Sequence, residues 1–85
     1  MARFLIERNF AEQLEVSKDG AAGVKQINDE EGVEWLFSFL SADKKKLYCL
    51  YEAPNAEAIR VAARRANLPA DSVIEVNDLR PEMFV

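Results

Sequence analysis

The chain has 85 residues and a net charge of −4, which predicts one domain over residues 1–85 and argues against nucleic acid and anionic membranes as partners. It has no histidine and a single cysteine, Cys49, so zinc sites, internal disulfides and histidine-based catalysis are excluded. Because the sequence shows no signal-peptide pattern and no apolar run of membrane-spanning length, we expect a cytoplasmic protein.

The N-terminal segment predicts a strand followed by a loop. Residues 2–8 alternate in the strand pattern, with Phe4 and Ile6 on one face and Leu5 and Glu7 on the other. Three apolar side chains of the loop are expected to pack on the core: Phe10, Leu14 and Val16.

The next segment predicts a helix and a second strand. Ser17 is a suitable N-cap and Gly32 a suitable C-terminal stop, so we expect a helix over residues 18–31. Its apolar face is narrow. Because the helix contains glycines, its stability is expected to depend on packing more than on intrinsic helix propensity. Residues 33–41 alternate as the second strand.

The second half of the chain carries the strongest local signals. A polar hairpin at 42–45 leads into a strand at 47–52, in which both faces are largely apolar. Asn55 caps a second helix, which ends near Ala66 before Pro69. Residues 72–77 form the last strand. The apolar end, residues 82–85, is expected to dock on the body or on a partner subunit.

This β-α-β-β-α-β order predicts an α+β, ferredoxin-like fold. It consists of one four-stranded antiparallel sheet with two helices on one face. The RNA-recognition fold has the same order, but the glycines of its motif are missing here and the net charge is negative. We therefore reject RNA binding.

The face away from the helices, called the open face, is predicted to be aromatic. Residues expected under the helices are Phe4, Ile6, Leu36, Ser38, Leu40, Leu50, Ile74 and Val76. Those expected on the open face are Leu5, Glu7, Trp35, Phe37, Phe39, Cys49, Tyr51 and Glu75. A surface with so many aromatic groups is expected to be buried against another surface. A second copy of the same sheet is the simplest partner for it, which predicts a homodimer of the dimeric α+β barrel type.

The candidate site lies on that face. Glu7 and Glu75 would lie on neighbouring strands close to Tyr51, and buried carboxylates are costly unless paired, protonated or on a metal. The candidate ligand-binding residues are Glu7, Trp35, Phe37, Cys49, Tyr51 and Glu75. In the alternative reading the carboxylates pair with arginines at a rim, the aromatic groups are interface core, and Cys49 is a small buried hydrophobe. No catalytic residue and no metal ligand is assigned.

Several motifs resemble a family of small bacterial domains of unknown function that includes a nickel-binding protein. They are Ala2-Arg-Phe-Leu-Ile-Glu-Arg8, Gly32-Val-Glu-Trp35 with Ser38, Cys49-Leu-Tyr-Glu-Ala-Pro54, Glu57-Ala-Ile-Arg60, Ala63-Arg-Arg-Ala66, Leu68-Pro-Ala-Asp71 and Glu75-Val76. The resemblance implies a ferredoxin-like fold, a homodimer and, in some members, nickel binding. Members often carry histidine where this chain has Phe37 and near Val61-Ala62. Oxygen ligands alone suit magnesium, calcium or manganese better than nickel.

Three functions are open at this point. The first is a homodimeric protein that binds a metal or small ligand on the open face. The second is an enzyme similar to cofactor-independent monooxygenases and isomerases of the dimeric α+β barrel type, with a glutamate as base. The third is a structural protein whose aromatic face only holds a dimer together.

Overall fold

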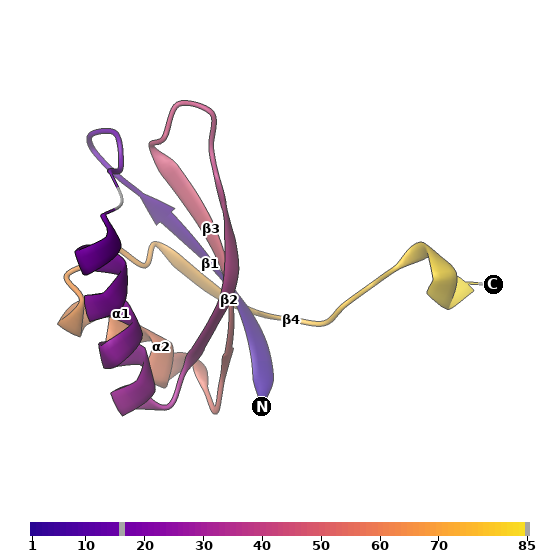
Figure 1. The fold of residues 1–85 in the computed structure, drawn as a ribbon. Helices are drawn as coiled ribbons and strands as arrows, with labels where there is room; N and C mark the ends of the chain where they lie inside the picture. Colours follow the sequence, from indigo (N-terminus) through magenta and orange to yellow (C-terminus); the bar gives the residue numbers. More distant parts are fainter. Residues whose placement is uncertain (16, 85) are drawn as a thin grey trace.

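The predicted order of strands and helices is confirmed in the computed structural model (Figure 1), which describes residues 1–15 and 17–84. Val16, predicted to pack on the core, and Val85 lie outside the described residues. The elements are β1 (Ala2–Asn9), α1 (Lys18–Glu31), β2 (Glu34–Leu40), β3 (Lys46–Ala53), α2 (Ala56–Arg65), β4 (Ser72–Val76) and the 3-10 helix η1 (Pro81–Phe84).

Both long helices begin at the capping residues that the sequence predicts. The Ser17 hydroxyl accepts a hydrogen bond from the backbone N–H of Gly20 at 3.0 Å, and the Asn55 side chain accepts one from Ala58 at 2.9 Å. Left-handed residues follow the two helix ends, Gly32 with φ of 72° and Asn67 with φ of 57°. These local signals fix where α1 and α2 begin and end.

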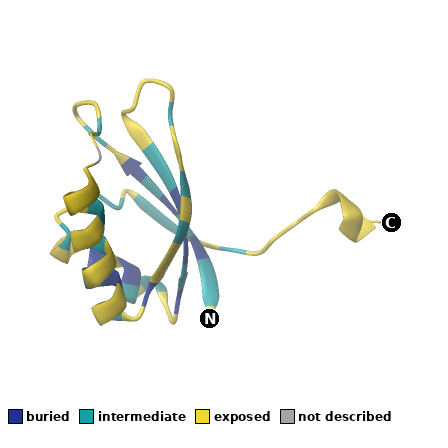
Figure 2. Ribbon diagram, viewed as in Figure 1, coloured by how far each residue is buried: buried dark blue, intermediate teal, exposed yellow. Residues whose placement is uncertain are grey.

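The four strands form one antiparallel sheet in the order β2-β3-β1-β4. Both helices lie on one face of it (Figure 1). The core between the layers consists of Phe4, Ile6, Val33, Cys49, Tyr51, Ala53, Ile59 and Ala62. Figure 2 shows the buried residues on β1, β3 and α2, whereas α1 is mostly exposed. The ferredoxin-like fold is therefore confirmed.

The register of the strands decides which side chains lie on the open face. Cross-strand partners point to the same side of a sheet, and Phe4 pairs with Tyr51 while Ile6 pairs with Cys49. The opposite side, the open face, carries Arg3, Leu5, Glu7, Phe37, Phe39, Tyr48, Leu50, Glu52, Ser72, Ile74 and Val76. The predictions for Leu5, Glu7, Phe37 and Phe39 agree with this register.

Seven predicted faces are wrong. Trp35, Cys49, Tyr51 and Glu75 lie on the helix side, and Leu50, Ile74 and Val76 lie on the open face. In β3 both sets of alternating residues are apolar, so alternation alone does not choose a face. In β2 a bulge between Trp35 and Phe37 shifts the register, so these two aromatic residues point to opposite faces.

The C-terminal residues leave the body of the molecule. Residues 77–84 are exposed throughout, and η1 stands away from the sheet on the side opposite the helices (Figures 1 and 2). Docking of this end on its own body is therefore not what the structure shows. In the described parts of the chain, no helix has the length and hydropathy needed to cross a membrane.

Candidate functional site

The six predicted site residues do not come together in one place. Glu7 and Phe37 lie on the open face, whereas Trp35, Cys49 and Tyr51 lie on the helix side. Glu75 lies on the edge strand β4, where it is exposed and pairs with Phe4 of β1. It therefore points away from the face that holds Glu7. The predicted carboxylate pair is therefore separated by the sheet. Binding by any of the six residues stays a prediction.

Three of the six line a cavity on the helix side, between α1, the loop before it and the sheet. The cavity has a volume of about 250 Å³. Its walls are mainly apolar and are formed by Arg8, Phe10, Leu14, Glu15, Ser17, Gly20, Ala21, Val24, Trp35, Leu47, Cys49, Tyr51, Ala66 and Leu68. Where α1 borders this space, its residues Gly20 and Ala21 are small. A dry cavity of about 150 Å³ already holds benzene, so this one is large enough for a small organic ring.

Arg8 is the buried charged group of this cavity, whereas Glu15, the other charged residue of its wall, is exposed. Only 2% of its surface is exposed, and one Nη1–H donates to the carbonyl oxygen of Pro69 at 2.7 Å. Its guanidinium carbon lies 5.9 Å from the centroid of the Tyr51 ring, which is within cation–π range. Among residues 1–15 and 17–84, no carboxylate forms an ion pair with Arg8. A buried positive charge without a negative partner is costly.

Tyr51 supplies a second polar group to the cavity wall. Burial raises the pKa of its hydroxyl, although the nearby Arg8 charge opposes that shift. The hydroxyl accepts a long hydrogen bond of 3.5 Å from Asn28, the one buried residue of α1. The Tyr51 group therefore keeps its proton at neutral pH and can donate it in a hydrogen bond. Arg8 and Tyr51 together form a donor pair suited to an anion.

The remaining predicted residues of the wall are Cys49 and Trp35. Cys49 is a buried free thiol in the floor. Trp35 donates from Nε1 to the Ser38 hydroxyl at 2.8 Å and is 40% exposed at the side of the cavity. In the part of the chain that the structure describes, no group of three or more histidine, cysteine or carboxylate side chains could hold a metal ion.

Sequence reasoning missed Arg8 as a site residue, although a signal was present. Arg8 continues the alternation of Phe4 and Ile6, which places a charge on the apolar face of β1. A charged residue at a core position marks a functional candidate. Asn28 gives no such signal, because its burial depends on how α1 lies against the sheet.

The sheet order, the antiparallel register and the single layer of helices define a ferredoxin-like α+β protein. Its family is known from sequence: the model of the SCO4226-like family, described as nickel responsive protein SCO4226-like, matches residues 4–76, and the chain belongs to this family. The crystal structure of SCO4226 from Streptomyces coelicolor A3(2) has the same fold, with a TM-score of 0.71. The two chains are 24% identical over 93% of this chain and 100% of that one. No curated protein matches the sequence.

Proposed function

We propose that this protein binds a small organic anion in the helix-side cavity. The observation that carries the proposal is the buried Arg8 guanidinium, which lies in a mainly apolar wall and forms no ion pair with any described carboxylate, including Glu15 of the same wall. A carboxylate ligand would supply the missing negative charge, and its apolar body would fill the remaining space. The proposal keeps the predicted small-ligand function and three of the predicted residues, but moves the site to the other side of the sheet.

The ligand class follows from the cavity walls. A guanidinium binds a carboxylate or a phosphate through charge-assisted hydrogen bonds, and the Tyr51 hydroxyl can add a further donor. The apolar lining disfavours a small hydrated anion such as inorganic phosphate, which has no apolar body to bury. A single ring or a short alkyl chain that carries one carboxylate fits both features. The volume of about 250 Å³ excludes large cofactors.

Trp35 provides a direct readout, because it lies in the cavity wall and is the single tryptophan of the sequence. Benzoate and phenylacetate should change its fluorescence in a saturable way, and calorimetry should give the same dissociation constants. Benzamide and phenylacetamide are neutral ligands of nearly the same shape. One charge-assisted hydrogen bond corresponds to a preference of about 10- to 150-fold for the acids. Equal affinity for acids and amides would contradict the role of Arg8.

A second candidate function is metal-related, and the nickel-responsive family is the observation that favours it. The donor atoms of one chain do not fit nickel, since histidine is absent and the described residues contain no three-residue ligand group. A nickel site would need donors from two copies. Equilibrium dialysis of chelator-stripped protein against nickel, with manganese and magnesium in parallel, tests this candidate. Saturable nickel binding at one ion per two chains would support it.

We also propose that the working unit is a homodimer of the dimeric α+β barrel type, paired through the open face. Phe37, Phe39 and Ile74 are 50%, 66% and 54% exposed on that face. Phe37 and Phe39 are stacked edge to face, with ring centroids 5.5 Å apart. A contiguous apolar surface of this kind is typical of an interface. Sedimentation at micromolar concentration should give a dimer, and Phe39→Asp should shift it to the monomer.

A further inference from the structure

The C-terminal segment 77–84, called the arm, is exposed and carries three large apolar side chains among charged ones. Leu79, Met83 and Phe84 have 76%, 57% and 75% of their surfaces exposed. The arm extends from the end of β4 away from the helices, on the side of the open face (Figure 1). Large apolar side chains on an extended segment gain stability only by packing against another apolar surface.

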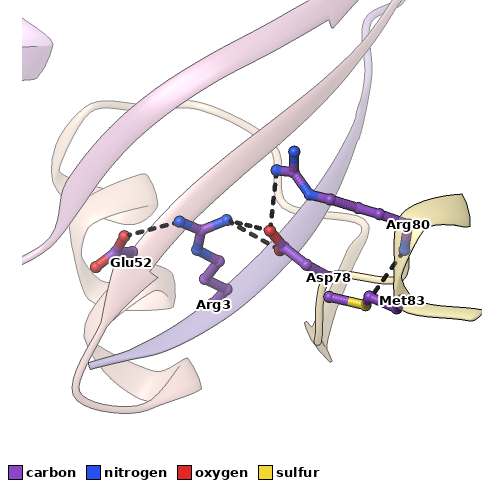
Figure 3. Close-up of polar contacts among 5 residues, drawn as sticks. All are labelled: Arg3, Glu52, Asp78, Arg80 and Met83. Carbon is purple, nitrogen blue, oxygen red and sulfur yellow. Dashed lines mark hydrogen bonds and ion pairs between the residues drawn. The ribbon is translucent and has the colours of Figure 1, made fainter. Parts of the chain in front are cut away.

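The base of the arm is held to the body, and the rest is not. Arg3 Nη1 forms an ion pair with Asp78 at 2.9 Å, and Arg3 Nη2 lies 3.5 Å from Glu52 (Figure 3). Arg80 pairs with the same Asp78 at 3.2 Å. Beyond Asp78, no hydrogen bond or ion pair within the described residues connects the arm to the body; Met83 bonds only to Arg80. These contacts fix the direction in which the arm leaves the sheet.

The exposed area and the radius of gyration agree with an arm that packs on another molecule. A compact monomer of 9.6 kDa exposes about 5,100 Å², whereas this chain exposes 5931 Å². The radius of gyration is 13.5 Å, against about 12 Å for a compact chain of this length. The excess area is roughly 800 Å², which is about what one partner buries in a standard interface. Among residues 1–15 and 17–84, Ile6 and Ile59 are the only large side chains that are fully buried, so further burial would stabilise the chain.

We infer that the arm of each chain packs on the open face of a second copy, with Leu79, Met83 and Phe84 against the ring surface of Phe37 and Phe39. This inference rests on the proposed dimer and names the segment that completes it. When identical segments are exchanged about a two-fold axis, both arms and both open faces are occupied, so the assembly stops at two copies. The aromatic side chains of the open face and the apolar side chains of the arm are then buried against each other.

The test compares full-length chains by analytical ultracentrifugation. The variant Leu79→Ser/Met83→Ser/Phe84→Ser removes the apolar groups of the arm, and Glu82→Ser is the matched control in the same exposed helix. We expect the triple variant to dimerise about 100-fold more weakly, as for the loss of central apolar anchors, and Glu82→Ser to dimerise as the parent. A dimer that is equally tight in all three chains would overturn the arm exchange but leave the dimer proposal standing. A monomeric parent chain would overturn both.

Isotope-filtered NMR on a mixture of labelled and unlabelled chains distinguishes exchange from folding back. Nuclear Overhauser contacts between Phe84 of one copy and Phe39 of the other would support the inference. Contacts that arise only within one chain would overturn it, because the arm would then cover its own sheet.

Discussion

The substitution Arg8→Met tests the proposed ligand site directly. It removes the buried positive charge and keeps an unbranched apolar side chain against the cavity wall. The lost charge-assisted hydrogen bond to a carboxylate ligand is worth about 1.5–3 kcal/mol. We therefore expect benzoate to bind about 10- to 150-fold more weakly to the variant, with little change for benzamide.

The same substitution should have a small effect on the stability of the ligand-free protein. The bond from Arg8 to the Pro69 carbonyl contributes about 1.5–3 kcal/mol because its donor is charged. Against this, a buried ion without a partner carries a desolvation cost of several kcal/mol. These opposed effects nearly cancel, so we expect the free energy of unfolding to change by no more than about 1 kcal/mol. For a chain of this size that corresponds to roughly 4–8 °C in Tm.

Trp35 fluorescence titrations and urea unfolding measure both quantities on the same samples. Arg60→Met is the matched control, since it removes the same charge from an exposed position on α2. The reasoning would be refuted by a loss of more than about 3 kcal/mol of stability together with unchanged benzoate affinity, the size expected when a buried polar contact is broken. Arg8 would then be a clamp on the turn that contains Pro69 and not a ligand-binding group.

Three further predictions follow from particular contacts. Gly23→Ala should raise the unfolding free energy by about 0.5–1 kcal/mol in urea titrations, because nothing lies within 4 Å of the added methyl; Gly32→Ala should lower it by about 1 kcal/mol because its φ is 72°. Thermal stability should fall above about pH 10, because burial raises the pKa of Tyr51 and the unfolded chain releases that proton at a lower pH than the folded chain. An equal fall in the Tm of a Tyr51→Phe variant would contradict this. Hydrogen bonding by Arg80 and the charge of Arg3 lower the pKa of Asp78, so their ion pairs are complete above its ordinary pKa and are lost as the pH falls through the lowered value. NMR should show the arm becoming more mobile at that acidic pH and in Asp78→Asn at neutral pH, whereas unchanged relaxation in Asp78→Asn would argue against an anchored base.

The local structure was determined by the sequence itself. Capping residues, helix stops and the left-handed Asn67 act through atoms a few positions away, so they do not depend on the rest of the fold. The order of strands and helices then permits few topologies, and the ferredoxin-like sheet is the one observed. The family could also be recognised from the sequence, because the family model matches residues 4–76.

The faces of the sheet and the site were decided only by the tertiary structure. Alternation in β3 fits either face, and the register with β1 places Cys49 and Tyr51 under the helices. One bulge in β2 reverses Trp35 relative to Phe37, because a single added residue changes the parity of a strand. The cavity arises where the small residues of α1 meet the sheet around Arg8. Such a space depends on the distance between layers, which no short stretch of sequence encodes.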